Sequence, residues 1–202
     1  SGPPTARPKS ACFRTADLVG LDTLAHVARN SHDLLPADEQ REAFRLPAFV
    51  DEMVKKGLLG NKAKQGFFKK TKGEKPETFF LDWKTGEYVP TRRPRFPSVE
   101  AAKALDEPGA RVRAVLAGKD PAAELAWRNL RDTLLYAVNR VPELADEIVE
   151  EDRAMRWGFS WELGPFELLD AIGVAEFVRR AEADGVAVPA VLREVKTFYA
   201  FE

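Results

Sequence analysis

The sequence predicts an all-α protein built from two related helical bundles, the first of them truncated, with a small β-hairpin between them. Three observations support this prediction. Apolar residues recur at the three- and four-residue spacing of amphipathic helices, strand signals are confined to one short stretch, and a pattern near the start of the chain recurs near its end. We therefore expect helices throughout the chain except in that stretch.

Helix signals are clearest in the second half of the chain. Asp120 followed by Pro121 predicts an N-cap and a first helical residue, and an apolar stripe then continues to Val141, where Pro142 should end or kink the helix. Further helices are predicted at Glu143–Arg156, from Gly164 and Pro165 to Gly173, at Ala175–Ala183 and at Pro189–Phe198.

The first half contains one clear amphipathic helix, Pro47–Lys56, which Gly57 should end. Two predicted strands, Thr78–Trp83 and Glu87–Pro90, flank a Lys-Thr-Gly turn and predict a small hairpin. A stretch rich in proline and arginine follows, from Pro90 to Gly118, and should connect two helical lobes with a short helix near 98–105.

The composition is that of a globular protein, with 31 Lys and Arg residues, 32 Asp and Glu residues and 45% hydrophobic residues. No apolar run approaches the roughly 18 residues of a membrane helix, and the first ten residues do not resemble a signal peptide. We therefore expect a cytoplasmic protein with no membrane partner. The near-zero net charge argues against nucleic acid as a partner. Cys12 alone cannot form an internal disulfide, and with two histidines it predicts no metal site.

The recurring pattern reads F-x-x-x-D-x-[VI]-G-[LV] and spans residues 13–21 and 166–174. A Pro-Ala pair follows in both places, at 47 and at 189, and then an aromatic pair, at 67–68 and at 198–199. This order predicts a duplication: residues 1–75 as the second half of a first repeat, 76–118 as hairpin and linker, and 119–202 as the second repeat. The chain is thus expected to be a piece of a longer protein.

Three motifs resemble the C-terminal helical domains of 3-hydroxyacyl-CoA dehydrogenases. They are D-x-A-M-x-x-G at residues 152–158, G-P-F-x-x-x-D-x-x-G at 164–173, and G-x-K-x-x-x-G-F-F at 60–68. The resemblance implies the helical-bundle fold of the 6-phosphogluconate-dehydrogenase C-terminal type. Two such domains in one chain are typical of proteins that fuse the dehydrogenase to an enoyl-CoA hydratase for fatty-acid β-oxidation.

The resemblance also implies a function for the longer protein: oxidation of a (3S)-3-hydroxyacyl-CoA substrate with NAD. A Rossmann domain carries NAD and the catalytic residues in that family, and no G-x-G-x-x-G motif occurs in this sequence. We therefore expect no catalytic and no cofactor-binding residues here, and no turnover by this chain alone. Its helices would close the substrate cleft and contact the Rossmann domain, the hydratase domain or a second subunit of a homodimer.

Trp157 is the one substrate contact that the resemblance carries over, because fused relatives place an aromatic residue at the matching position. A core position is the alternative, since large aromatic residues after a helix usually pack inside. The asparagine that the family places near the substrate falls, in this second repeat, at or near Trp127, a residue that has no amide side chain. The second repeat is thus expected to be degenerate as a catalytic helper.

Asp152 lies on an apolar stripe, where a bare carboxylate would cost several kcal/mol. A catalytic acid is one interpretation, and a cap on the helix that begins at Gly164 and Pro165 is the favoured one. Asp17 and Asp170, at matching points of the two repeats, are expected to act in the same way.

Lysines are concentrated between Lys55 and Lys75, around Phe67 and Phe68. A solvated loop is the favoured interpretation, and contact with the phosphates of CoA or with another domain is the alternative. Nucleic-acid binding would also suit this pattern, but the charge balance and the resemblance argue against it. A competing function for the whole chain is a non-catalytic helical module that binds acyl-CoA or a partner protein.

Overall fold

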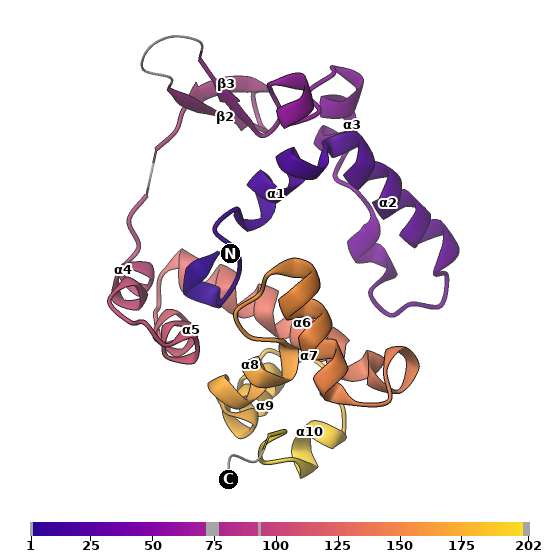
Figure 1. The fold of residues 1–202 in the computed structure, drawn as a ribbon, viewed down its shortest axis with the longest axis vertical. Coiled ribbons are helices and arrows are strands. Elements are labelled where there is room, and N and C mark those ends of the chain that lie inside the picture. Colours follow the sequence, from indigo (N-terminus) through magenta and orange to yellow (C-terminus); the bar gives the residue numbers. More distant parts are fainter. Residues whose placement is uncertain (1, 72–76, 93, 200–202) are drawn as a thin grey trace. The chain divides into compact units, whose positions relative to one another are not determined.

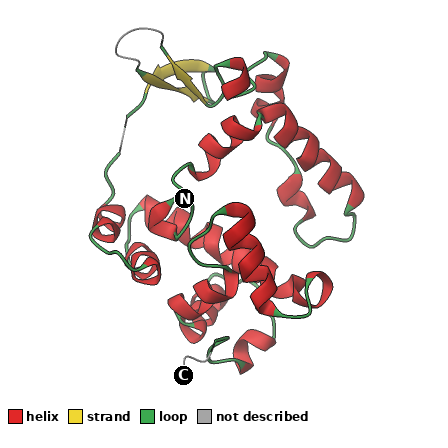
Figure 2. Cartoon of the chain, viewed as in Figure 1, coloured by secondary structure: helices red, strands yellow, loops and turns green. Residues whose placement is uncertain are grey.

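The computed structural model describes residues 2–71, 77–92 and 94–199. Lys72 and Lys75 of the predicted basic loop lie outside these residues. Helices dominate the described chain, with one small antiparallel sheet (Figure 1, Figure 2). The chain divides into two compact units, described separately: the sheet unit, Ser10–Pro94, and the helical unit, Ser1–Lys9 together with Arg95–Glu202. No helix in the described chain is both long enough and apolar enough to cross a membrane.

The sheet unit places its helices before its strands. Its elements are α1 (Ala11–Val19), α2 (Leu21–Leu34), the 3-10 helix η2 (Arg41–Phe44), α3 (Ala48–Lys55), the 3-10 helix η3 (Asn61–Ala63), β1 (Phe68–Lys70), β2 (Thr78–Asp82) and β3 (Glu87–Pro90). The helix predicted at Pro47–Lys56 is confirmed as α3, and its Val50 and Met53 lie in a small core with Ala16 and Leu21. Cys12, on α1, is exposed.

The sheet has the strand order β1-β2-β3. The predicted hairpin is confirmed as β2 and β3, whose turn contains Gly86 at a φ of 74°. Strand β1 was not predicted. It has only three residues, two of them lysines, so no alternation of apolar and polar residues marks it in the sequence.

The helical unit surrounds its longest helix, α6. Its elements are the 3-10 helix η1 (Pro3–Thr5), α4 (Pro97–Lys103), α5 (Pro108–Leu116), α6 (Pro121–Leu144), α7 (Ile148–Phe159), α8 (Pro165–Ile172), α9 (Val174–Ala183) and α10 (Val191–Glu194). The predicted N-cap is confirmed, since Asp120 accepts hydrogen bonds from the backbone N–H groups of Ala122 and Ala123. Helix α5 lies in the predicted connector and was missed, although Glu107 and Pro108 are its cap and first residue.

Two predicted helix ends were wrong. Helix α6 continues through Pro142 to Leu144, so it does not end at that proline, and a kink there stays a prediction. Helix α7, predicted to end at Arg156, continues to Phe159. The helix predicted at Pro189–Phe198 is reduced to the four residues of α10. The end of that segment instead donates backbone hydrogen bonds to Asp170, which holds it away from a helical path.

The core of the helical unit lies between α6 and the helices α8 and α9. Leu130 and Leu134 of α6 are buried with Phe166 of α8 and Phe177 of α9. Full burial of such side chains contributes roughly 1.5–3 kcal/mol each. This core fixes α8, the helix that carries Asp170 and whose first N–H groups bind Asp152.

Candidate functional site

Trp157, the predicted substrate contact, lies on the surface of α7. Its side chain is 76% exposed, and the guanidinium of Arg153 one turn earlier lies 5.8 Å from the ring centroid. A core role for Trp157 is therefore wrong. The exposed ring offers a flat apolar face that a ligand or another domain could cover.

The aromatic residues beside Trp157 do not form one cluster with it. Phe159 is exposed as well, and Ser160 then ends α7 in a left-handed conformation with a φ of 54°. Trp161, after this turn, is half-buried against the core, and the guanidinium of Arg7 lies 4.1 Å from its ring centroid. Of these three aromatic residues, Trp157 and Phe159 are the exposed ones, and they remain available for contacts outside the helical unit.

Asp152 joins α7 to the start of α8. Its side chain is buried, and its carboxylate accepts hydrogen bonds from the backbone N–H groups of Phe166 at 2.8 Å and Glu167 at 3.1 Å and from the Tyr199 hydroxyl at 2.6 Å. The predicted role as a helix cap is confirmed. Burial raises the pKa of Asp152, and these three hydrogen bonds oppose that rise. Burial and the bond to Asp152 together raise the pKa of Tyr199.

Asp17 and Asp170 make one type of contact, which we call the carboxylate clamp. Asp17 accepts hydrogen bonds from the backbone N–H groups of residues 67 and 68, both at 2.8 Å. Asp170 accepts them from residues 198 and 199, at 2.8 and 2.9 Å. The prediction that these aspartates cap a helix start was wrong. Each one instead holds the chain that returns to its helix about 30 or 50 residues later.

Other features repeat around the two clamps. The rings of Phe13 and Phe67 lie 4.7 Å apart at 64°, and those of Phe166 and Phe198 lie 4.9 Å apart at 69°. A glycine with positive φ follows each helix: Gly20 at 102° and Gly173 at 94°. These residue types and geometries recur in the order that the sequence pattern shows.

The two clamps differ in what covers them. Phe13 is 58% exposed whereas Phe166 is 1% exposed, and Leu24 is 36% exposed whereas Phe177 is fully buried. Large apolar side chains are exposed on both helices of the first clamp, and we call this set the α1–α2 face: Phe13, Leu18, Val19, Leu24, Val27 and Leu34. In the helical unit α6 and α7 pack on α8. Among the described residues of the sheet unit, nothing covers the α1–α2 face in this way.

An apolar groove of about 660 Å³ adjoins this face. Aromatic rings from α1, α3 and the sheet line it, among them Phe13, Phe49, Phe80 and Trp83. A groove with this lining suits an apolar chain or an apolar side chain of another domain.

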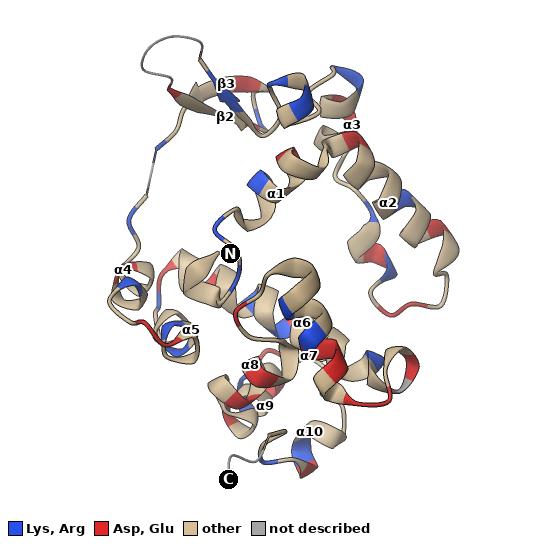
Figure 3. Ribbon diagram, in the orientation of Figure 1, with Lys and Arg blue, Asp and Glu red and all other residues tan. Residues whose placement is uncertain are grey.

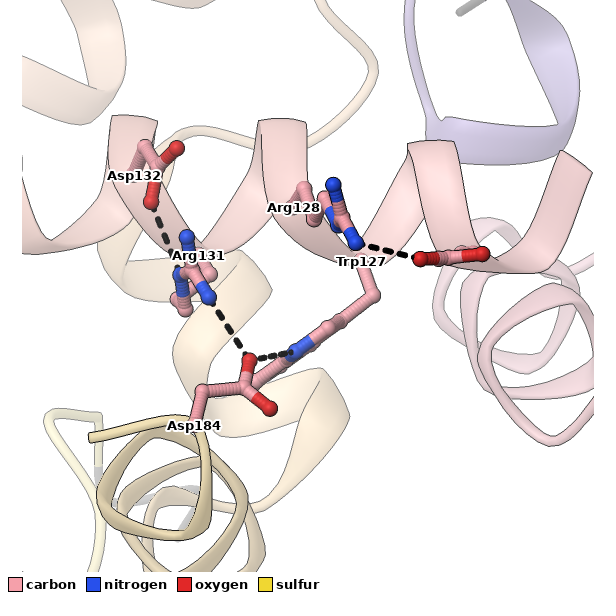
Figure 4. Close-up of polar contacts among 6 residues, drawn as sticks. Trp127, Arg128, Arg131, Asp132 and Asp184 are labelled. Carbon is pink, nitrogen blue, oxygen red and sulfur yellow. Dashed lines mark hydrogen bonds and ion pairs between the residues drawn. The ribbon is translucent and has the colours of Figure 1, made fainter. Parts of the chain in front are cut away.

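Trp127 lies at or near the position where the resemblance would place a substrate-binding asparagine. Its side chain is buried, and its indole N–H donates to Asp184 at 2.7 Å (Figure 4). Arg131 donates to the same carboxylate, and the guanidinium of Arg180 lies 4.2 Å from the indole centroid. This cluster holds α6 against the end of α9. The indole N–H of Trp127 already donates to Asp184.

Two parts of the site were not predicted. The first is the Tyr199 hydroxyl, whose signal was present in the sequence: the aromatic pairs at 67–68 and 198–199 differ by one hydroxyl, which needs a partner when buried. The second is the groove, because its rings come from four separate elements and no sequence spacing brings them together.

Comparison with known proteins identifies the region that contains the first clamp. Residues 7–70 match the family model of the 3-hydroxyacyl-CoA dehydrogenase C-terminal domain. A probable 3-hydroxyacyl-CoA dehydrogenase of Bacillus subtilis is 44% identical over 98% of this chain, which covers 25% of that protein. A protein of Deinococcus radiodurans with the same description is 46% identical over 40% of this chain.

A putative fatty acid oxidation complex trifunctional enzyme of Rickettsia felis is 26% identical over 80% of this chain, which covers 21% of it. The chain thus spans about a quarter or less of the length of these relatives. The family match covers both partners of the first clamp, Asp17 and the N–H groups of residues 67 and 68. Residues 7–70 of this chain belong to the 3-hydroxyacyl-CoA dehydrogenase C-terminal domain family.

Proposed function

We propose that this chain is the substrate-side helical part of an NAD-dependent dehydrogenase that oxidises (3S)-3-hydroxyacyl-CoA in fatty-acid β-oxidation. One observation carries the proposal beyond the family match: the α1–α2 face is exposed, whereas Phe166 and Phe177 at the matching points of the helical unit are buried. Exposed apolar area of this kind marks a surface that packs against something else. The other domains of a longer dehydrogenase would supply that cover.

We further propose that residues 1–75 and 119–202 derive from one duplicated helical domain, with 76–118 between them. The recurring pattern, the two carboxylate clamps and the two ring pairs support this proposal. Two such domains would suit a fusion with an enoyl-CoA hydratase. The description of the Rickettsia relatives as trifunctional enzymes of fatty acid oxidation supports this part of the proposal.

The described residues do not fit an NAD site. Their sheet is a three-stranded antiparallel one, whereas a dinucleotide is held at the carboxyl end of a parallel sheet by a glycine-rich turn. The cofactor, and the residues that remove the proton from the 3-hydroxyl group, would therefore belong to another domain. The role left for this chain is to shape the substrate side of the cleft and to contact the neighbouring domains.

Trp157 is our candidate for a contact with the acyl-CoA substrate. Its side chain is 76% exposed and so accessible for such a contact, and it lies on the helix that Asp152 fixes to α8. The Trp127 position offers no amide to a substrate. We therefore propose that the helical unit forms one wall of the substrate cleft and takes no part in the chemical reaction.

The alternative is a non-catalytic helical module that binds acyl-CoA or a partner protein. The aromatic groove and the exposed α1–α2 face favour it. Both proposals need that face to be covered, but only the first needs a dehydrogenase domain in the same protein.

Hydroxyl-radical footprinting tests the observation on which the first proposal rests. In residues 1–202 alone, Phe13 and Leu24 should be oxidised readily. In the longer dehydrogenase both should be protected, because other domains cover the α1–α2 face. Phe177, buried within the helical unit, is the internal control and should be protected in both samples. Equal oxidation of Phe13 and Leu24 in the two samples would contradict the proposal.

A further inference from the structure

A second depression in the sheet unit is polar and shares Leu18 with the α1–α2 face. It measures about 450 Å³ and lies between α1, the turn after η3 and strand β1. We call it the cationic cleft, and its lining residues are Ser10, Arg14, Asp17, Leu18, Asn61, Lys64, Phe68 and Lys70. Figure 3 shows blue segments, which mark Lys and Arg, on α1 and near the strands of the sheet unit.

Three cations converge on the cleft from three different elements. Arg14 comes from α1 and lies over the Phe68 ring at 4.9 Å, Lys64 follows η3, and Lys70 ends β1. Among the described residues, none of these three side chains has a carboxylate within 4 Å. The neighbouring Lys62 differs from them, because it forms an ion pair with Asp22.

The one carboxylate in the cleft, Asp17, does not neutralise these cations by an ion pair. Both of its oxygens accept backbone N–H groups in the carboxylate clamp, and its side chain is buried. The cleft therefore has three cations against one buried carboxylate, and the charge of Arg14 acts on that carboxylate without a direct ion pair. Asn61 and Ser10 add neutral donors to its wall.

The clamp itself does not require these cations. At the matching points of the helical unit, Glu167 replaces Arg14 and Val195 replaces Lys64. Glu167 there accepts a hydrogen bond from the Gly164 N–H and pairs with Arg156. The Asp170 clamp thus forms with a negative charge at the position where the Asp17 clamp has a positive one. Stability of the clamp therefore does not explain the cations of the cleft.

We propose that the cationic cleft binds a phosphate-bearing small molecule with at least two negative charges. Three cations on separate elements match the several oxygens of a diphosphate better than a single carboxylate. The volume of about 450 Å³ also leaves room for a diphosphate with an attached nucleoside. The presence of a phosphate site does not depend on the proposed function, whereas its assignment to CoA rests on it.

Two kinds of ligand carry such phosphate groups: CoA, in its nucleotide part, and a free phosphate compound. Titration calorimetry of residues 1–202 with pyrophosphate, adenosine 3′,5′-bisphosphate and CoA, each at low ionic strength, separates them. We expect one saturable site per chain. Tighter binding of the bisphosphate and CoA than of pyrophosphate assigns the site to CoA, and equal or weaker binding assigns it to free phosphates.

The test variant combines Arg14→Gln, Lys64→Gln and Lys70→Gln. We expect at least a tenfold loss of affinity for every ligand that binds. The matched control, Lys84→Gln with Lys119→Gln and Lys196→Gln, removes the same charge from exposed lysines elsewhere and should change affinity less than twofold. The charge-preserving variant Arg14→Lys with Lys64→Arg and Lys70→Arg should keep most of the affinity.

Two results would overturn the proposal. One is an absence of saturable binding by any of the three ligands to the unmodified chain. The other is an equal loss in the test and control variants, which would mean unspecific attraction by net charge. Neither result bears on the dehydrogenase proposal, whose test does not involve this cleft.

Discussion

The hydroxyl group of Tyr199 donates a 2.6 Å hydrogen bond to Asp152, the carboxylate that also caps α8. The backbone N–H of the same tyrosine donates to Asp170. One residue near the end of the described chain therefore connects the cap of α8 to the carboxylate clamp on the same helix.

Replacing Asp152 with asparagine should lower the free energy of unfolding by about 1–3 kcal/mol. The amide nitrogen would face a donor in a buried site, so one N–H or hydroxyl loses its acceptor. Chemical denaturation followed by circular dichroism measures the loss. The control is Asp146→Asn in the exposed loop before α7, which should change stability by less than about 0.5 kcal/mol. A loss no larger than that of the control would contradict the assigned role.

Tyr199→Phe should cost less than Asp152→Asn, about 0.5–1.5 kcal/mol, because it removes one donor and leaves the cap in place. The double variant should lose less than the sum of the two single losses, since the two groups contact each other. Strict additivity in this cycle would mean that the hydroxyl and the carboxylate do not interact in solution.

Two capping aspartates should titrate on opposite sides of their ordinary pKa of 3.8. Burial raises the pKa of Asp152, so its contribution to stability is largest when it is protonated and declines as pH rises from 3.8 through its folded value. Asp120 is half-buried, and the Ser98 backbone N–H is the main cause that lowers its pKa. Its stabilising contribution is present above 3.8 and is lost as pH falls through its folded value.

Carbon-detected NMR titration of the side-chain carboxyls measures both midpoints directly. The order expected is Asp120 below 3.8 and Asp152 above it. A midpoint for Asp152 at or below that of Asp120 would show that hydrogen bonding outweighs burial at the α8 cap.

The glycines near the clamp and on α7 should respond to alanine in opposite directions. A Cβ at Gly66 would lie 2.2 Å from the Asp17 carboxylate and 2.5 Å from the Gly60 backbone, so Gly66→Ala should break the first clamp and destabilise the sheet unit. Gly158 is exposed in α7 with nothing near its Cβ position, so Gly158→Ala should stabilise the chain by up to about 1 kcal/mol. Urea denaturation measures whether each variant raises or lowers the free energy of unfolding. A stabilising Gly66→Ala would contradict the claim that the first carboxylate clamp stabilises the sheet unit.

The cap and the clamps show how far the sequence predicts this fold. Asp152 lies one helix before its partners, so a carboxylate on an apolar stripe followed by Gly-Pro was enough to predict the cap. Asp17 finds its partners about 50 residues later, at the start of a strand too short to leave a pattern, and its contact could not be predicted. Local capping signals are readable because they join neighbouring residues, whereas long-range contacts depend on how the elements pack.

The same limit applies to the candidate site. The resemblance selected Trp157, but its exposure depends on how α7 lies against α8, which no sequence spacing gives. The sequence favoured a solvated loop for the lysines near Phe67. It did not predict that two of them would share a cleft with Arg14, because α1 lies far away in the chain.

Trp157→Ala should separate binding from folding. Because the side chain is exposed, unfolding of residues 1–202 should change by less than about 0.5 kcal/mol. In the longer dehydrogenase the same change should raise KM for an acyl-CoA substrate severalfold, as expected for a lost apolar contact of about 1 kcal/mol. Phe159→Ala, which removes another exposed ring from the same helix, is the control. Equal kinetic effects of the two substitutions would contradict a specific role for Trp157.

Turnover is the most direct test of the claim that this chain is one part of a dehydrogenase whose redox chemistry belongs to another domain. NADH formation from NAD and 3-hydroxybutyryl-CoA should be measured for residues 1–202 and for the longer protein that we propose contains them. The account predicts turnover by the longer protein and none by residues 1–202. Turnover by residues 1–202 alone, or none by the longer protein, would contradict it.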